Sequence, residues 1–266
     1  MTVDYRETTE DLQTRIDIHQ QYGSKDIDKW MLELLKPKQG ISILDVGCGS
    51  GKQLMAFHQY LDGEAKITGG DINEELLEQA RERNASVGDA WEVNELDFNE
   101  RFPLPDEAYD LVSCCFAIYY SADIPITVSE IRRVLKPGGR LFTTGPMPQN
   151  KATFYEVIKE ATGKPIPPMP GSSRYDSEIL GTIRHQFADV DTHIFENPLE
   201  FDSAEPFIAY TRASLSEDRG LWTPLFETSE GFEGVMTQIE GVARGRIADD
   251  HRLVMTKVVG GFVATK

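Results

Sequence analysis

The sequence predicts an α/β fold in which a mostly parallel β-sheet is covered by helices on both faces. The first observation is an apolar run, Ile41–Val46, which is followed by glycines at alternate positions and by a helical pattern that begins near Lys52. A run of this kind is typical of a strand buried on both faces, as in a parallel sheet. The second observation is that strand-like and helix-like patterns alternate from residue 41 to residue 145. A chain of 266 residues has room for one large domain of this class.

The composition is that of an ordinary globular protein, with 40% hydrophobic and 27% charged residues. The formal net charge of −17 argues against a broad nucleic-acid or anionic-membrane surface, so we expect neither partner. The three cysteines have no disulfide or metal-site spacing, and we expect no metal. The polar, acidic N-terminus is unlike a signal peptide, which favours the cytoplasm. The oligomeric state is not indicated.

Residues 1–40 are predicted to form an N-terminal helical cap. Two periodic apolar patterns lie between Thr9 and Leu35, and they are separated by a break at residues 22–24. Pro37 and Gly40 end the second helix before the first strand.

The glycine-rich turn is the strongest candidate for a ligand site. Gly47, Gly49 and Gly51 allow a sharp turn and a close backbone approach to a ligand, because they lack Cβ atoms. The helix that follows directs its N-terminal N–H groups to the same place. A dinucleotide fingerprint would have a third glycine where Lys52 stands, so this sequence disfavours an NAD-dependent dehydrogenase.

A second strand, Lys66–Gly70, is predicted to end at Asp71. Asp71 follows Gly51 by about 20 residues, the interval at which an acidic residue meets the ribose hydroxyls in this architecture. The alternative is an acidic residue that stabilises the next helix through its dipole. Asn73 is the predicted cap of that helix.

The next elements continue the alternation. Three further strands are predicted at Trp91–Leu96, Tyr109–Cys115 and Arg140–Gly145. A helix precedes the last of them and ends in the LKPGG turn at residues 135–139.

These landmarks, in this order, resemble the class I S-adenosylmethionine-dependent methyltransferases, and in particular their small-molecule, type 11 or ubiquinone-biosynthesis-like branch. The resemblance rests on DVGCGSG at residues 45–51, on Asp71, on FPLPD ahead of the fourth strand and on the LKPGG turn. It implies a Rossmann-like seven-stranded sheet with an antiparallel last strand. It also implies S-adenosylmethionine as the cofactor and in-line methyl transfer to O, N or C of a small molecule. A non-catalytic cofactor-binding subunit of the same fold is the alternative.

The resemblance also implies site residues. An acidic residue after the third strand would reach the adenine amino group while an apolar neighbour covers the ring. Asp97 and Phe98 fit this position, and Asp89 competes with Asp97 because GDA is another form of the motif. The shorter gap to Tyr109 favours Asp97. The predicted cofactor-binding residues are Asp45, Gly47, Cys48, Gly49, Gly51, Asp71, Ile72, Asp97, Phe98, Cys115, Phe116 and Tyr22.

The candidate catalytic residues are Tyr119 and Tyr120, just after the fourth strand, and His19 in the cap. The tyrosines could orient an acceptor, and a histidine could act as a general base for a hydroxyl acceptor. For His19 and Tyr22, simple packing is the alternative. No NPPY-like or DPPY-like tetrapeptide follows Asp110, which disfavours the nucleic-acid and glutamine N-methylating branches.

Within one overall domain, residues 41–145 are predicted to be the cofactor-binding core. Residues 146–266 are predicted to be an acceptor-binding insertion and the end of the sheet. We expect a sixth strand at Val190–Phe201 and a final strand, or a hairpin around Gly260-Gly261, at Leu253–Thr265. Several aromatic residues could line an acceptor pocket or belong to the core: Phe154, Tyr155, Tyr175, Phe207, Tyr210, Trp222 and Phe226.

Overall fold

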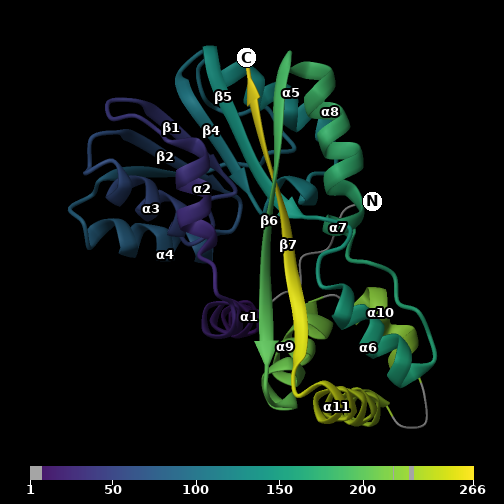
Figure 1. The fold of residues 1–266 in the computed structure, drawn as a ribbon. Helices are drawn as coiled ribbons and strands as arrows, with labels where there is room; N and C mark the ends of the chain where they lie inside the picture. Colours follow the sequence, from purple (N-terminus) through teal and green to yellow (C-terminus); the bar gives the residue numbers. More distant parts are fainter. Residues whose placement is uncertain (1–7, 218, 228–230) are drawn as a thin grey trace.

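The computed structural model describes residues 8–217, 219–227 and 231–266. Its centre is a seven-stranded sheet with the strand order β3-β2-β1-β4-β5-β7-β6 (Figure 1). The strands are β1 (Ser42–Val46), β2 (Lys66–Asp71), β3 (Trp91–Glu95), β4 (Tyr109–Cys115), β5 (Leu135–Pro146), β6 (Asp189–Phe201) and β7 (Leu253–Thr265). The neighbouring strands β3, β2, β1, β4 and β5 all pair in parallel, whereas β7 runs antiparallel to both β5 and β6. The predicted Rossmann-like, mostly parallel sheet with an antiparallel last strand is confirmed.

Some of the helices cover both faces of the sheet, as predicted. The helices of the described residues are α1 (Thr9–Tyr22), α2 (Ile27–Leu35), α3 (Lys52–Tyr60), α4 (Glu74–Ala85), α5 (Ile124–Val134), α6 (Ala152–Thr162), α7 (Pro170–Arg174), α8 (Leu180–Gln186), α9 (Ala204–Glu217), α10 (Arg219–Phe226) and α11 (Gly231–Asp250). A 3₁₀ turn, η1 (Ile118–Tyr120), follows β4, and a π-helical turn, η2 (Tyr175–Ile179), joins α7 to α8.

Two hydrophobic clusters lie on opposite faces of the sheet. On one face, α2, α3 and α4 contribute buried residues such as Met31, Phe57 and Leu77. On the other face, α5, η2 and α8 contribute residues such as Ile131 and Ile183. This double cover explains why the parallel strands are apolar without alternation.

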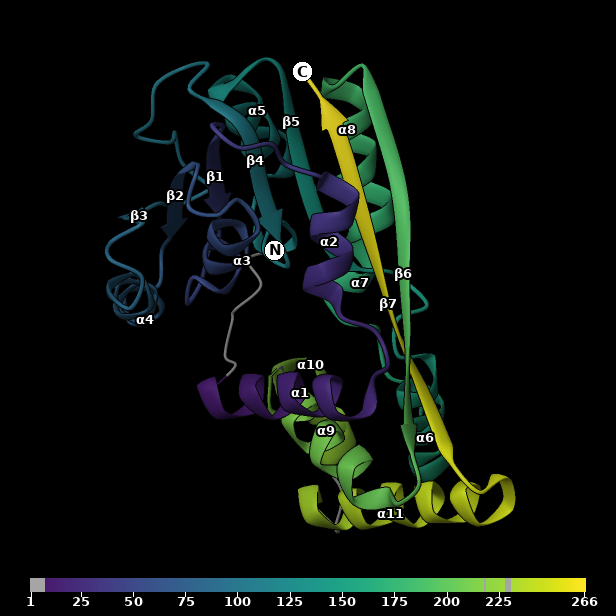
Figure 2. The same cartoon turned by 60° about the vertical axis from the view of Figure 1, so that its left-hand side comes forward.

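A third hydrophobic cluster lies beyond the sheet, around the far halves of β6 and β7. Strand β5 pairs with β7 only from Val259 to Thr265, but β6 pairs with β7 along its whole length. The extension carries α1, α6, α9, α10 and α11 (Figure 2). Figures 1 and 2 show that these helices lie beyond the carboxyl ends of β4 and β5. The cap helix α1 and the helices of the insertion therefore share one layer.

The final strand is continuous, so the alternative of a hairpin around Gly260-Gly261 is wrong. A Cβ on Gly260 would lie 2.6 Å from the Met147 sulfur, and one on Gly261 would lie 2.7 Å from the Trp30 ring. The two glycines therefore let side chains from both faces close onto the strand.

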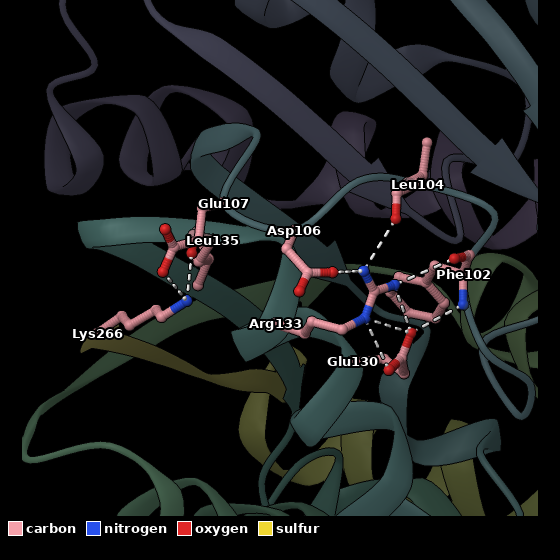
Figure 3. Close-up of polar contacts among 8 residues, drawn as sticks. All are labelled: Phe102, Leu104, Asp106, Glu107, Glu130, Arg133, Leu135 and Lys266. Atoms are coloured by element: carbon pink, nitrogen blue, oxygen red, sulfur yellow. Dashed lines mark hydrogen bonds and ion pairs between the residues drawn. The ribbon is translucent and has the colours of Figure 1, made fainter.

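The connection from β3 to β4 contains no helix and is held to α5 by Arg133 (Figure 3). The Arg133 guanidinium donates to the carbonyls of Phe102 and Leu104 and to the carboxylates of Asp106 and Glu130. Glu130 also accepts from the Phe102 backbone N–H at 2.9 Å. This network adds polar contacts to a loop whose Phe102 and Leu104 side chains also pack in the cluster on the α5 face.

The predicted LKPGG turn is part of a strand. Strand β5 begins at Leu135, and its pairing with β4 has an irregularity between Tyr109 and Leu111. Gly138 has a φ of +74° and donates its N–H to the Lys266 carbonyl at 3.0 Å. The glycines thus shape a bulge that the C-terminal residue covers.

Helix α11 contains glycines that weaken helix propensity, but its apolar residues recur at helical spacing. It forms because Val235, Met236, Ile239 and Ala243 are buried in the third cluster. No helix in the described ranges is long and apolar enough to cross a membrane.

Candidate cofactor and acceptor site

The glycine turn after β1 is tied to β2 and to the segment after β4. Gly47, Gly49 and Gly51 have φ values of +73°, +51° and +77°. The N–H groups of Gly47 and Cys48 both donate to the Gly70 carbonyl, at 2.7 and 3.1 Å. A Cβ on Gly47 would lie only 2.4 Å from the Ala117 Cβ. The turn therefore needs glycine both for its backbone conformation and for its packing.

Asp71 stands at the end of β2 with both carboxylate oxygens fixed by backbone donors. The Gly49 N–H donates to Oδ2 at 2.9 Å, and the Asn73 N–H donates to Oδ1 at 2.9 Å. Asn73, and not Asp71, caps α4 by accepting from Glu75 and Leu76. Each Asp71 oxygen can accept further hydrogen bonds, so the carboxylate is positioned to receive two neighbouring hydroxyls.

Asp45 is a buried carboxyl at the end of β1, only 2% exposed. Burial raises the pKa of Asp45 to about 7, and the nearby charge of Asp71 adds to this shift. The Ser113 hydroxyl donates a hydrogen bond to Asp45 at 2.5 Å and opposes the shift. Within the described residues, no basic side chain forms an ion pair with Asp45. A buried acid without a cationic neighbour fits a positively charged ligand group, such as the ammonium of an amino acid moiety.

Asp97 and Asp89 lie at opposite ends of β3. Asp97 follows the carboxyl end of the strand, at the same edge of the sheet as Asp71 and the glycine turn. Asp89 precedes the amino end, where it is exposed. Because ligands of open α/β sheets bind outside the carboxyl ends, the structure favours Asp97 for an adenine contact. The carboxylate of Asp97 accepts from the Asn99 backbone N–H at 2.8 Å.

Two apolar side chains stand beside these acids. Ile72, directly after Asp71, is 60% exposed, which is unusual for an isoleucine at the end of a buried strand. Phe98 is partly buried against the cluster on the α5 face. Ile72 is therefore the freely accessible apolar surface at this end of the site.

Three of the predicted cofactor residues have side chains that pack elsewhere. Cys48 lies in the cluster of α2 and α3, and Cys115 packs against the same cluster. Burial raises the pKa of both thiols, so neither is a thiolate at neutral pH. The Tyr22 ring lies 5.2 Å from the Phe201 ring within the third cluster. The Tyr22 side chain thus packs in the core, which was the alternative to a cofactor contact. Cys48 contributes its backbone to the glycine turn.

The segment after β4 contains the candidate acceptor contacts. Phe116 has a φ of +56° and donates its N–H to the Thr144 carbonyl at 2.9 Å. Tyr119 and Tyr120 follow in η1, with ring centroids 4.6 Å apart. The Tyr119 carbonyl accepts from Arg174 at 3.1 Å. The structure thus anchors this segment to β5 on one side and to α7 on the other.

His19 lies in α1, where its Nε2 is 3.3 Å from the Tyr210 hydroxyl of α9. Its Nδ1 is buried and has no hydrogen-bond partner in the described part of the chain. Burial lowers the pKa of His19 well below its usual value, and the charges of Lys257, Lys151 and Arg15 lower it further. The imidazole is therefore neutral at pH 7 and can accept a hydrogen bond at one ring nitrogen.

Two lysines near this histidine were not predicted. Lys151, between β5 and α6, is 7% exposed. The Lys257 ammonium lies 5.3 Å from the centre of the Phe116 ring. Burial lowers the pKa of Lys257 to about 8; the charges of Lys151 and Lys52 lower it further, and the charge of Asp28 opposes the shift. Lys257 is the one charged residue in the strand LVMTKVVGGFVAT, and this pattern could have marked it as a candidate site residue. No comparable pattern in the sequence indicates that Lys151 is buried.

The five large aromatic side chains Phe154, Tyr175, Phe207, Tyr210 and Trp222 are almost wholly buried. Tyr175 stacks on Phe262 at 4.5 Å, and the Phe154 ring lies 6.0 Å from the Trp222 ring. These residues form core, as the alternative interpretation had it.

Comparison with known proteins gives matches that agree with this site. A family model described as a methyltransferase domain matches residues 43–139, which include the glycine turn, Asp71 and Asp97. The 27-O-demethylrifamycin SV methyltransferase of Amycolatopsis mediterranei is 29% identical over 211 residues, which are 77% of this chain and 67% of that protein. The ubiquinone/menaquinone biosynthesis C-methyltransferase of Shewanella halifaxensis is 29% identical over 42% of this chain and 45% of its own length. The chain thus spans less than half of that relative.

A solved structure shows the same fold. The BH2331 protein of Bacillus halodurans C-125 aligns with a TM-score of 0.60 and 20% identity, over 90% of this chain and 98% of that protein. The fixed Asp71 carboxylate, the buried acid Asp45 and the exposed Ile72 fit a ribose, an ammonium group and an adenine ring, respectively. Residues 43–139 thus match a methyltransferase domain, and the chain is similar to methyltransferases such as these two relatives.

Proposed function

We propose that this protein transfers the methyl group of S-adenosylmethionine to a small-molecule acceptor. The observation that carries the proposal is the Asp71 carboxylate, which Gly49 and Asn73 hold at the end of β2 beside the glycine turn. The two relatives support the substrate class, because one is named for 27-O-demethylrifamycin SV and the other for ubiquinone/menaquinone biosynthesis.

The proposed cofactor contacts follow the edge of the sheet. Asp71 binds the two ribose hydroxyls, Asp97 binds the adenine amino group, and Ile72 covers the adenine ring. Asp45 binds the ammonium of the methionine moiety, because a cation compensates its buried charge. The backbone of the glycine turn lies against the same moiety.

Bound S-adenosylmethionine supplies an activated methyl group on a sulfonium. The protein's part is then to hold the acceptor in line and to exclude water. Phe116, Tyr119 and Tyr120 lie just beyond β4 and are proposed to flank the reacting atoms. The neutral His19 is proposed to accept a hydrogen bond from a hydroxyl acceptor on the opposite, α1 side.

Calorimetry with S-adenosylhomocysteine and NADH tests the cofactor assignment. We expect S-adenosylhomocysteine to bind and NADH not to bind. Asp71→Ala should weaken the binding of S-adenosylhomocysteine by about 1–3 kcal/mol, as for lost hydrogen bonds to a charged group. Release of S-adenosylhomocysteine from S-adenosylmethionine in the presence of candidate acceptors then tests turnover. Cofactor binding without turnover on any acceptor class would favour a non-catalytic subunit.

We further propose that the protein acts in the cytoplasm and without nucleic acid. All three cysteines are free thiols, which is compatible with a reducing compartment. The net charge of −17 opposes a polyanion.

A further inference from the structure

Two lysines at the acceptor end of the site, the buried Lys151 and the half-buried Lys257, lack a direct ion pair in the described part of the chain, although the Asp28 charge acts on Lys257 from a distance. Within the described ranges, neither Lys151 nor Lys257 forms an ion pair with a carboxylate, although the chain has 44 acidic residues. Lys52, at the start of α3, is by contrast paired with Asp28 at 2.7 Å. A buried ammonium without an anionic partner is costly, so the pair needs an explanation.

Both lysine ammonium groups lie over aromatic rings. The Lys151 ammonium lies 5.1 Å from the Tyr210 ring centre, 5.8 Å from the Phe154 ring centre and 3.9 Å from the Met169 sulfur. The Lys257 ammonium faces the Phe116 ring. Aromatic rings attract a cation but leave its hydrogen-bond donors unused. Both side chains therefore have donors available for a ligand.

The backbone beside this pair is in an uncommon conformation. Lys151 has a φ of +60° and Phe116 a φ of +56°, although neither residue is glycine or asparagine. Lys151 is held there by its N–H, which donates to the Thr256 carbonyl at 3.0 Å. Left-handed conformations of such residues are costly and concentrate at ligand sites. The fold thus maintains a position that brings the Lys151 side chain inward.

The order of the strands separates the pair from the cofactor. The ribose-binding Asp71 ends β2, the glycine turn follows β1 and Phe116 follows β4. Lys151 comes after β5, and Lys257 lies in β7, two and three strands from the glycine turn. The charge of Lys151 nevertheless reaches Lys257 and His19. The lysines therefore lie on the acceptor side of the reacting atoms.

We propose that the methyl acceptor carries an anionic group, a carboxylate or a phosphate, which Lys151 and Lys257 bind beyond the carboxyl ends of β4 and β5. This inference rests on the proposed function and specifies its substrate class. Two ammonium groups can donate to two oxygens of one anion, and such charge-assisted bonds are among the stronger ones in proteins. The unpartnered Nδ1 of His19 and the hydroxyl of Tyr210 border the same cluster and would contact the acceptor next to its anionic group.

The test uses the full chain saturated with S-adenosylhomocysteine and three probes: benzoate, phenyl phosphate and the neutral benzamide. Binding is measured by ligand-observed NMR and calorimetry. We expect an anionic probe to bind about tenfold or more tightly than benzamide. Preference for benzoate or for phenyl phosphate distinguishes the two anions. Lys151→Met and Lys257→Met should each remove about tenfold of that preference, whereas Lys159→Met, on the exposed side of α6, should leave it unchanged.

S-adenosylhomocysteine binding separates this inference from the proposed function. Its affinity for both lysine variants should stay within about twofold of wild type, because the lysines bind the acceptor. A large loss would mean that they bind the carboxylate of the cofactor and would overturn the inference. Equal binding of benzamide and both anions would overturn it as well. If the wild-type protein fails to bind S-adenosylhomocysteine, the proposed function itself is wrong. Thermal unfolding shows that each variant is folded.

Discussion

Substitution of Asp45 by asparagine should change stability and cofactor affinity in opposite directions. The folded protein holds the pKa of this carboxyl at about 7, compared with 3.8 for an unperturbed group. Between these two values the native state keeps a proton that the unfolded state has lost. The free energy of unfolding therefore falls as the pH rises, and the contribution of Asp45 is fully lost above pH 7.

The size of the effect follows from the shift. One pKa unit corresponds to about 1.36 kcal/mol, so the contribution of Asp45 should fall by about 3 kcal/mol between pH 5 and pH 8. Asp45→Asn does not titrate. Relative to the variant, the wild-type protein should therefore lose about 3 kcal/mol of unfolding free energy over this range. At pH 8 the variant should be the more stable protein, because it buries no ionised carboxylate.

Urea denaturation of both proteins at pH 5, 6, 7 and 8 measures this difference, and subtraction cancels the other titrating groups. Asp89→Asn is a matched control, because Asp89 is exposed at the opposite edge of the sheet. Calorimetry should show Asp45→Asn binding S-adenosylhomocysteine about tenfold or more weakly, since the ammonium loses its carboxylate partner. A stability difference that does not change with pH would mean that Asp45 is ionised throughout, and would refute this reasoning.

Three other substitutions test separate parts of the structure. Gly47→Ala places a Cβ 2.4 Å from that of Ala117 at a φ of +73°, so circular dichroism melting should show a loss of about 2 kcal/mol or more, and an unchanged melting point would contradict the packing. Arg133→Met removes the guanidinium that donates to Glu130 and to two carbonyls, and leaves Glu130 with the Phe102 N–H as donor. We expect urea denaturation to show a loss of about 2–4 kcal/mol, and a smaller loss in Glu130→Gln is the paired comparison. Lys257→Met removes a half-buried ammonium that forms no ion pair within the described ranges. The substitution should raise the unfolding free energy of the ligand-free protein at pH 7, whereas a loss would mean that the charge is compensated within the fold.

The sequence predicted most of the cofactor half, because its determinants are local. Gly47, Gly49 and Gly51 follow one strand directly, and Asp71 ends the next strand along the chain. Parallel strands bring such ends to one edge, so spacing along the chain was enough to place them together. The gap to Tyr109 favoured Asp97 over Asp89, and the structure adds that these two residues lie at opposite ends of β3.

The acceptor half was poorly predictable, because contacts between distant segments build it. His19 meets Tyr210 across 191 residues, and Lys151 meets the same ring from the loop before α6. Gly260 and Gly261 suggested a turn, but in the structure they leave space for the side chains of Met147 and Trp30 to pack against the strand. The burial of these groups depends on tertiary packing that no periodicity along the chain records.

A crystal structure of the protein with S-adenosylhomocysteine tests the central claim most directly. We expect both ribose hydroxyls to lie within hydrogen-bond distance of the Asp71 carboxylate and the ammonium to contact Asp45. We expect the sulfur to face residues 116–120, with Lys151 and Lys257 beyond it. A ribose bound away from Asp71, or a methionine carboxylate held by Lys151 and Lys257, would contradict the account.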